Sequence, residues 1–204
     1  MIELHLVRHG AVDGDGRVYG ARVDPPLSTG GHAEVDALRD RLVGGSGPAQ
    51  LIRSPATRAA QTSEALGLGP AEVDQRWAER DLGEREGCSW SEFWTLAPPE
   101  VSTDPASYVA WVPPGGESVA SLRERVVEAL EQLAVQAPEQ PAGEAGDPPA
   151  SIVVVTHRGP IVCAVAHALD LDDATATRLE IATATVTTLR RYAGGHWTVR
   201  AVGR

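Results

Sequence analysis

The 204-residue sequence predicts an α/β fold, a three-layer sandwich in which helices flank a mostly parallel central sheet. Short apolar runs at residues 2–7, 49–52 and 151–156 are expected to be strands, since each is too short for a typical helix. Segments with helical spacing separate these runs, which is the order expected of parallel strands joined by helices. The run 151–156 is apolar at successive positions, as in a strand that helices cover on both faces.

The remaining elements follow from helix caps, apolar stripes and turn residues. The first helix is expected to follow Ser28 or Thr29 as its N-cap and to end at Gly44. Ser54 is expected to cap the second helix, with Pro55 at the first helical position. Further helices are expected at residues 90–96, 105–111, 119–135 and 161–169, a weak strand at 71–75, and a hairpin of strands at 185–192 and 197–202.

A single domain over residues 1–204 accommodates these elements, because the chain is short for two domains. Residues 137–150 are rich in Pro, Gly, Ala and Glu and are predicted to form a flexible surface loop. No apolar run approaches the ~20 residues that span a bilayer, and the N-terminus lacks a signal-peptide pattern. Two distant cysteines, Cys88 and Cys163, fit reduced thiols. We therefore expect a cytoplasmic protein without a membrane partner.

The formal net charge of −10 argues against nucleic acid as a partner. Against this acidic background, cationic side chains gather at the expected strand ends. Arg8 and His9 follow the first strand, Arg58 lies near the start of the helix after the second, and His157 and Arg158 follow the third run. Because parallel strands end at one edge of a sheet, these side chains are expected to converge. Guanidinium groups suit phosphoryl oxygens, and a neutral imidazole can attack phosphorus.

Several aromatic side chains lie between residues 77 and 111, in a chain that is only 4% aromatic. They are Trp77, Trp90, Phe93, Trp94, Tyr108 and Trp111. Two interpretations are open: the rings pack in the core, or some of them form a cap over a pocket.

Short motifs follow one another along nearly the full length of the chain. They are Leu6-Val7-Arg8-His9-Gly10, Asp24-Pro25-Pro26-Leu27-Ser28-Thr29-Gly30, the Ser54-x-x-x-Arg58-Ala59-x-x-Thr62 pattern, Glu79 with Gly83 and Glu86-Gly87, Gly116-Glu117-Ser118, and His157 after an apolar strand. In this order they resemble the histidine phosphatase superfamily, the phosphoglycerate-mutase-like proteins. The resemblance implies a phosphoglycerate-mutase-like fold.

The resemblance also implies a role for each matched residue. His9 would be the nucleophile that becomes phosphohistidine, while Arg8, Arg58 and His157 would hold the phosphoryl oxygens. Glu79 would be the general acid for the leaving oxygen, and then the base for water.

The chain departs from the family pattern at three places. It has Gly10-Ala11-Val12 where the family often has Gly-Glu-Thr, and the asparagine that is common a few residues later is not evident. These two departures leave open one phosphate contact that the resemblance implies. Arg158 stands where a glycine is more usual. Its side chain either binds substrate or points outward, and the sequence leaves both open.

Three functions are compatible with these residues: a metal-independent phosphomonoesterase for a small phosphorylated metabolite, a phosphoglycerate mutase, and an inactive binding module. The resemblance implies that mutases of the family are longer chains with an arginine-containing segment that binds the substrate carboxylate. Residues 88–101, the corresponding segment here, contain no arginine. This favours the phosphatase. Neither a cofactor nor a metal is expected, because a Walker-type loop and metal-ligand spacing are both missing. The sequence leaves open the physiological substrate and whether the chain forms a homodimer.

Overall fold

The computed structural model describes residues 1–14, 16–42, 48–136 and 150–204 and contains one six-stranded sheet in the order β3-β2-β4-β1-β5-β6. The strands are β1 (Ile2–Arg8), β2 (Gln50–Arg53), β3 (Glu72–Val73), β4 (Ala150–Thr156), β5 (Val186–Arg191) and β6 (Trp197–Ala201). The first four are parallel to one another, β5 pairs antiparallel with β1, and β6 pairs antiparallel with β5 at one edge of the sheet. The predicted fold class, a mostly parallel sheet flanked by helices, is confirmed.

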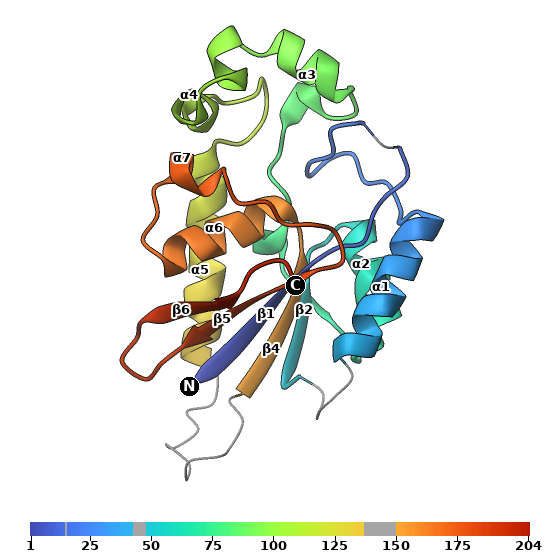
Figure 1. The fold of residues 1–204 in the computed structure, drawn as a ribbon, viewed down its shortest axis with the longest axis vertical. Helices are drawn as coiled ribbons and strands as arrows, with labels where there is room; N and C mark the ends of the chain where they lie inside the picture. The colour runs from blue at the N-terminus through green and yellow to red at the C-terminus, as the bar shows by residue number, and fades with distance from the viewer. Residues whose placement is uncertain (15, 43–47, 137–149) are drawn as a thin grey trace.

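Helices cover both faces of this sheet (Figure 1). α1 (Thr29–Leu42) and α2 (Thr57–Leu66) lie on one face, and α5 (Val119–Gln136) and α6 (Arg158–Ala168) on the other. In β1, Leu4 and Leu6 belong to the core beneath α5 and α6, whereas Val7 belongs to the core beneath α1 and α2. The alternation of side chains along a strand therefore supplies two cores from one apolar run.

The structure corrects the predicted start of two helices. α2 begins at Thr57 rather than Pro55, and its N-cap is Ala56, without a side-chain hydrogen bond. The Ser54 hydroxyl, which we expected to cap this helix, instead bonds the His157 ring. α6 begins at Arg158 rather than Ile161, with His157 as its N-cap. The His157 side chain, like that of Ala56, makes no hydrogen bond to the helix that it caps.

Two other predictions differ from the structure or lie outside it. The weak strand at 71–75 is reduced to the two residues of β3, which lie at the edge of the sheet, pair only with β2 and are both exposed. The Gly44 end of the first helix and residues 137–149 of the predicted loop lie outside the described residues. Ala150, the last residue assigned to that loop, is the first residue of β4 and is buried.

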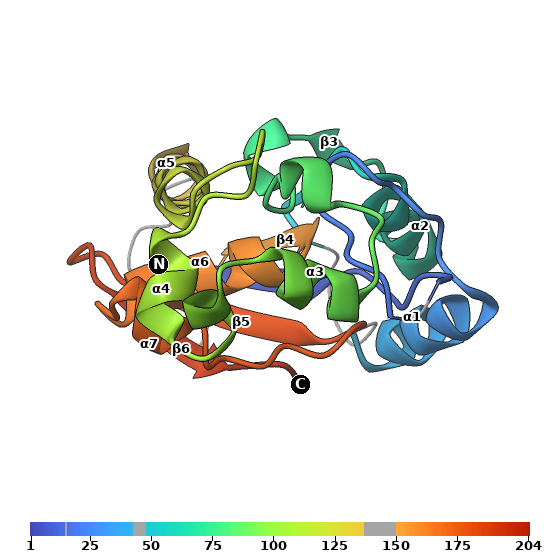
Figure 2. The same ribbon diagram turned by 90° about the horizontal axis from the view of Figure 1, so that it is seen from above.

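A cap of short helices lies above the edge at which the parallel strands end (Figures 1 and 2). It consists of α3 (Trp90–Leu96), the 3-10 turn η3 (Pro99–Ser102) and α4 (Pro105–Ala110), beside α7 (Asp173–Ala176). Ser89 caps α3 in a capping box with Glu92, and Asp104 caps α4. Phe93 is buried with Val18 and Leu82.

The cap joins the rest of the chain through two further 3-10 turns, η1 (Gln75–Trp77) and η2 (Gly83–Arg85). Each interpretation of the aromatic segment holds for some of its rings. Trp77 and Phe93 are buried in the core, whereas Trp90 and Trp94 are partly exposed on the cap. Within the described residues, no helix is both long and apolar enough to cross a membrane.

Candidate active site

Two histidines meet where neighbouring parallel strands end. β1 and β4 pair in register, with Arg8 opposite Thr156, so the next residue of each strand is a histidine at the same level. The His9 backbone N–H donates to the Thr156 carbonyl at 3.0 Å. The ring centroids of His9 and His157 lie 5.0 Å apart, edge to face. The structure thus brings these two predicted site residues together.

His9 is held as a neutral ring with one nitrogen available. Its side chain is 7% exposed, and Nδ1 lies 2.8 Å from the Gly10 carbonyl oxygen. Because a carbonyl only accepts, Nδ1 carries the proton and Nε2 carries a lone pair. Burial, with help from the charges of Arg58 and Arg8, lowers the pKa of His9 to about 3. The ring is therefore an unprotonated base or nucleophile at neutral pH.

His157 is fully buried and has one unsatisfied nitrogen. Its Nε2 lies 2.7 Å from Ser54 Oγ, and its Nδ1 has no hydrogen-bond partner in the described part of the chain. Burial, followed by the charge of Arg58, lowers its pKa well below the usual value. A buried nitrogen without a partner is costly, and a bound anion would satisfy it if Nδ1 carries the proton.

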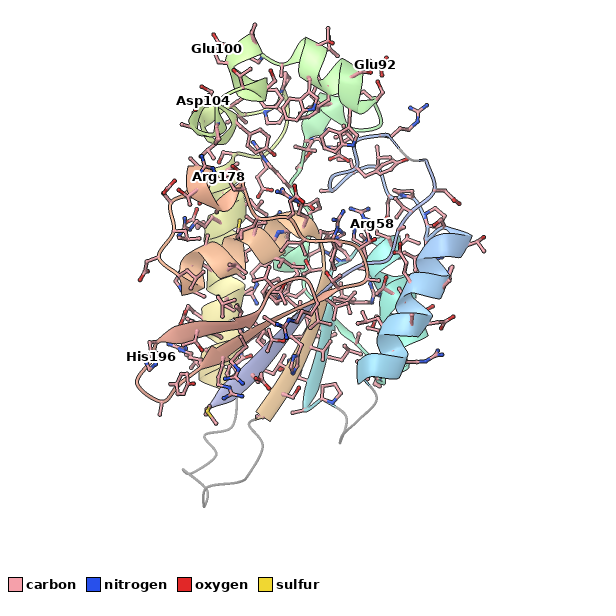
Figure 3. All side chains as sticks on the ribbon, in the orientation of Figure 1. Arg58, Glu92, Glu100, Asp104, Arg178 and His196 are labelled. Atoms are coloured by element: carbon pink, nitrogen blue, oxygen red, sulfur yellow. The ribbon has the colours of Figure 1, made fainter. Side chains whose placement is uncertain are left out.

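Two arginines add positive charge to the same place. Arg58, labelled in Figure 3, projects from α2 and is 2% exposed; it donates to Asp24 Oδ1 at 3.1 Å and to the Gly20 carbonyl at 2.8 Å. Arg8 donates to the Ile181 carbonyl. Burial lowers the pKa of both guanidinium groups, and the nearby Glu79 opposes that effect. In each, Nε is buried without a partner among the described residues, and an anion could accept from both.

Glu79 faces these cations from the loop after η1. Its Oε2 accepts from the Gly159 backbone N–H at 3.1 Å and its Oε1 from the Arg80 N–H at 2.8 Å. A Cβ at position 159 would lie 2.1 Å from Glu79 Oε1, so any larger residue there would displace the Glu79 carboxylate from this position. Arg8, His9, Arg58 and Glu79 together line a cleft of about 230 Å³.

Arg158 does not line this cleft. Its guanidinium donates to the carbonyl oxygens of Thr177 at 2.9 Å and Leu179 at 2.8 Å, and it borders two neighbouring cavities. Arg158 is therefore a candidate contact for the remainder of a substrate rather than for the phosphoryl group, and its role in substrate binding stays a prediction.

Sequence reasoning missed Glu86 as a member of the site. Its carboxylate accepts backbone N–H groups of Ala21, Arg22, Val23 and Leu82, at 2.7 to 3.0 Å. It thereby holds the segment 20–24, whose Gly20 carbonyl and Asp24 carboxylate orient Arg58. In the sequence, Glu86 stands out only as part of the Glu86-Gly87 pair. No local pattern indicates that it supports Arg58.

The match of a family model for the histidine phosphatase superfamily (branch 1) to residues 4–204 shows that the chain belongs to this superfamily. A bifunctional protein of Mycobacterium tuberculosis is 30% identical over 212 residues, covering 98% of this chain and 53% of that protein. The chain spans about half the length of this relative.

Two further relatives are named phosphatases. A metal-independent phosphoserine phosphatase of Arabidopsis thaliana is 27% identical over 171 residues, covering 77% of this chain and 64% of that protein. The solved structure of a mycobacterial glucosyl-3-phosphoglycerate phosphatase superposes with a TM-score of 0.84 at 27% identity, covering 100% of this chain and 99% of that chain. This likeness confirms the phosphoglycerate-mutase-like fold.

Proposed function

We propose that the protein is a metal-independent phosphomonoesterase that works through a phosphohistidine at His9. The observation that carries the proposal is the state of His9: a buried, neutral ring whose Nδ1 donates to Gly10, set among Arg8, Arg58 and His157. That arrangement leaves a nucleophilic Nε2 beside three donors suited to phosphoryl oxygens.

The reaction proceeds in two steps. In the first, His9 Nε2 forms a bond to phosphorus as the bond to the alcohol oxygen breaks, and the Glu79 carboxyl gives its proton to that oxygen. In the second, water attacks phosphorus, Glu79 takes a proton from it, and the phosphorus–nitrogen bond breaks to release inorganic phosphate. In both steps, Arg8, Arg58 and the Nδ1–H of His157 donate hydrogen bonds to the phosphoryl oxygens and stabilise their negative charge.

The relatives support hydrolysis, since both named phosphatases share this fold or sequence. The phosphoglycerate mutase alternative lacks support in the segment 88–101, which contains no arginine to grip a substrate carboxylate. Against the inactive alternative, Arg8, His9, Arg58 and Glu79 line one cleft and the His157 ring lies 5.0 Å from that of His9.

The test is hydrolysis of p-nitrophenyl phosphate in the presence of a chelator. We expect activity without added metal, and a loss of about a thousand-fold or more in His9→Ala. The matched control is His32→Ala, an exposed histidine on α1, which should retain full activity. Full activity in His9→Ala, or loss of activity on chelation, would contradict the proposal.

A second assay separates hydrolysis from isomerisation. Phosphate release from 3-phosphoglycerate is compared with its conversion to 2-phosphoglycerate. Efficient interconversion with little phosphate release would replace the phosphatase by the mutase.

A further inference from the structure

A cavity of about 180 Å³, the inner cavity, opens off the cleft beside His9. The two spaces share four wall residues, Arg8, Tyr19, Glu79 and Trp90. Side chains of α5, α6 and α7 form much of the remaining wall, and Figure 1 shows these helices below α4 of the cap. The inner cavity therefore begins where the proposed general acid stands.

The wall that α5, α6 and α7 supply is apolar. At the position that a Cβ of Gly159 would take, Leu122 Cδ2 lies 3.3 Å away and Glu79 Oε1 lies 2.1 Å away, so apolar surface begins directly beside the carboxylate. Each apolar side chain of this wall is at most 8% exposed. They are Val119, Leu122, Val162, Cys163, Ala166 and Ala176. Since an apolar cavity of about 150 Å³ binds benzene, the inner cavity has room for about six carbon atoms.

Beyond those of the cleft, the charged side chains around the inner cavity have partners within the protein. Arg158 donates to two backbone carbonyl oxygens, and Asp173 accepts from Arg123 at 2.6 Å. Arg80 also donates to two backbone carbonyl oxygens, at 2.9 and 2.8 Å. Its Nη1 is buried without a hydrogen bond among the described residues, and its guanidinium carbon lies 5.3 Å from the Tyr108 ring centroid. The surface that the inner cavity offers a ligand is therefore mainly apolar.

We propose that the substrate is the phosphate monoester of an apolar alcohol of about six carbon atoms, whose hydrocarbon part fills the inner cavity. This rests on the proposed phosphatase function, since it names the substrate class of the same site. With the phosphoryl group against His9 and the ester oxygen facing Glu79, the carbon chain leaves the cleft past Glu79. Each methylene group that enters the inner cavity leaves water, which favours binding by about three- to four-fold. A polyol or a charged alcohol would lose its hydrogen bonds to water there.

The experiment uses n-alkyl phosphates from ethyl to decyl, below their critical micelle concentrations, because their leaving groups have nearly equal intrinsic reactivity. We expect kcat/KM to rise about three- to four-fold per methylene group up to about the hexyl ester, and then to level off once the cavity is full. 2-Ethoxyethyl phosphate has the length of the pentyl ester and should be poorer by about ten-fold, since its ether oxygen loses hydrogen bonds to water. A flat series, a rise that continues to the decyl ester, or equal values for the pentyl and ethoxyethyl esters would overturn the proposal.

Two variants of the wall change its capacity in opposite directions. Leu122→Ala should move the levelling point to esters longer by about two carbon atoms, because truncation leaves a cavity. Val162→Phe should lower the hexyl-to-ethyl ratio of kcat/KM by about ten-fold or more, because the ring takes up the space. The matched control is Leu130→Ala, a buried leucine on the same helix as Leu122 that borders neither the inner cavity nor the cleft.

Leu130→Ala should lower the melting temperature, as Leu122→Ala does, and leave the levelling point in place. If Val162→Phe does not fold, Leu122→Ala decides. A levelling point that Leu122→Ala does not move, or that Leu130→Ala moves equally, would overturn the proposal.

Binding of n-alkylphosphonates, which have no ester bond to hydrolyse, distinguishes this proposal from the proposed function. Ethylphosphonate and hexylphosphonate are titrated into the wild-type protein and into Val162→Phe by calorimetry. We expect the wild type to bind hexylphosphonate about 50-fold or more tightly than ethylphosphonate. If no ester is hydrolysed but this preference holds and shrinks in Val162→Phe, the apolar subsite stands and the phosphatase fails. If the esters are hydrolysed with equal kcat/KM and the two phosphonates bind equally, the phosphatase stands and the apolar subsite is overturned.

Discussion

At the scale of single residues, Ser54 shows how a side chain acquires a role from a distant partner. Its hydroxyl oxygen lies 2.7 Å from His157 Nε2 and accepts the Ala56 backbone N–H at 3.3 Å. If the hydroxyl hydrogen goes to Nε2, the neutral ring must carry its own proton on Nδ1. That is the tautomer which can donate to a phosphoryl oxygen. Ser54 is therefore expected to set the hydrogen-bonding state of His157.

Ser54→Ala should lower kcat/KM for p-nitrophenyl phosphate by about 10- to 100-fold, the effect of about 1–3 kcal/mol from one lost buried hydrogen bond. The melting temperature is measured alongside, so that loss of fold is recognised. Ser63→Ala removes another buried hydroxyl, from α2, and should leave kcat/KM unchanged. Equal activity in wild type and Ser54→Ala would show that His157 needs no such partner.

At the scale of elements, one arginine of α5 holds the backbone that carries Glu79. Arg125 pairs with both carboxylate oxygens of Glu117, at 2.8 and 2.9 Å. It also donates to the carbonyls of Arg76 and Ala78, at 2.7 and 2.8 Å, and to that of Glu79 at 3.0 Å. The Gly116-Glu117-Ser118 turn and α5 together therefore position the proposed general acid.

Arg125→Lys should impair esters of poor leaving groups more than esters of good ones. Lysine lacks the planar fork, so the Glu79 backbone is no longer fixed. p-Nitrophenolate leaves without much help from an acid, whereas the alkoxide of glycerol 3-phosphate requires it. General acids contribute roughly 10²- to 10⁴-fold, so we expect an extra loss of about ten-fold or more for the alkyl ester.

The control for this variant is Arg190→Lys, a paired arginine that borders none of the cleft and its two neighbouring cavities. It should change neither kcat/KM value. A parallel loss for both esters in Arg125→Lys would assign Arg125 to stability alone.

The contact between α1 and the loop after His9 depends on a glycine of the helix. A Cβ on Gly31 would lie 1.9 Å from the Ala11 carbonyl oxygen. The same loop is tied to α1 by the Ala11 N–H, which donates to Glu34 at 3.0 Å. The first turn of α1 and the Gly10-Ala11 segment can therefore approach only with glycine at position 31.

Gly31→Ala should destabilise the protein by about 1–3 kcal/mol, as an overpacked contact does. For a chain of this size, that corresponds to about 2–4 °C in melting temperature per kcal/mol. Gly30→Ala is the matched control, since its Cβ would meet nothing closer than Ser28 Oγ at 3.7 Å. It should be neutral or stabilising by about 0.5–1 kcal/mol. Equal melting temperatures for the two variants would contradict this account.

At the scale of the whole molecule, folding is coupled to pH through the buried imidazoles. In the unfolded chain, His9 and His157 take up protons near the usual pKa of 6.5, whereas in the folded chain burial lowers both pKa values, that of His9 to about 3. Below about pH 6.5 the unfolded state therefore binds more protons than the folded state. The free energy of unfolding must then fall as the pH falls, and must be insensitive to these rings above pH 7.

We expect the free energy of unfolding to fall by up to about 1.4 kcal/mol per pH unit for each ring as the pH drops from 6.5 toward 5. Urea unfolding at pH 7, 6 and 5 measures the slope. His9→Asn and His157→Asn should each reduce this slope by the contribution of one protonating ring, up to about 1.4 kcal/mol per pH unit. His32→Asn, at an exposed position, should not. An unchanged slope in both buried variants would contradict burial as the cause.

Local patterns along the chain are enough to predict the layered fold and the convergence of the main site residues. Apolar runs separated by helical patterns require parallel strands, and parallel strands end at one edge, so His9 and His157 are brought together by patterns that are local along the chain. The Arg58 position followed in the same way from a strand and a helix start, even though the predicted cap at Ser54 was wrong.

The roles of the supporting side chains, in contrast, depend on contacts that form when the chain packs. Ser54 and His157 are 103 residues apart, and Arg125 and the Glu79 carbonyl are 46 apart, so no periodicity or spacing links them. The exposure of Trp90 beside a buried Phe93 likewise depends on which side of a short helix faces the core. Side-chain hydrogen bonds and burial are properties of the packed chain, whereas strand and helix patterns are properties of the covalent one.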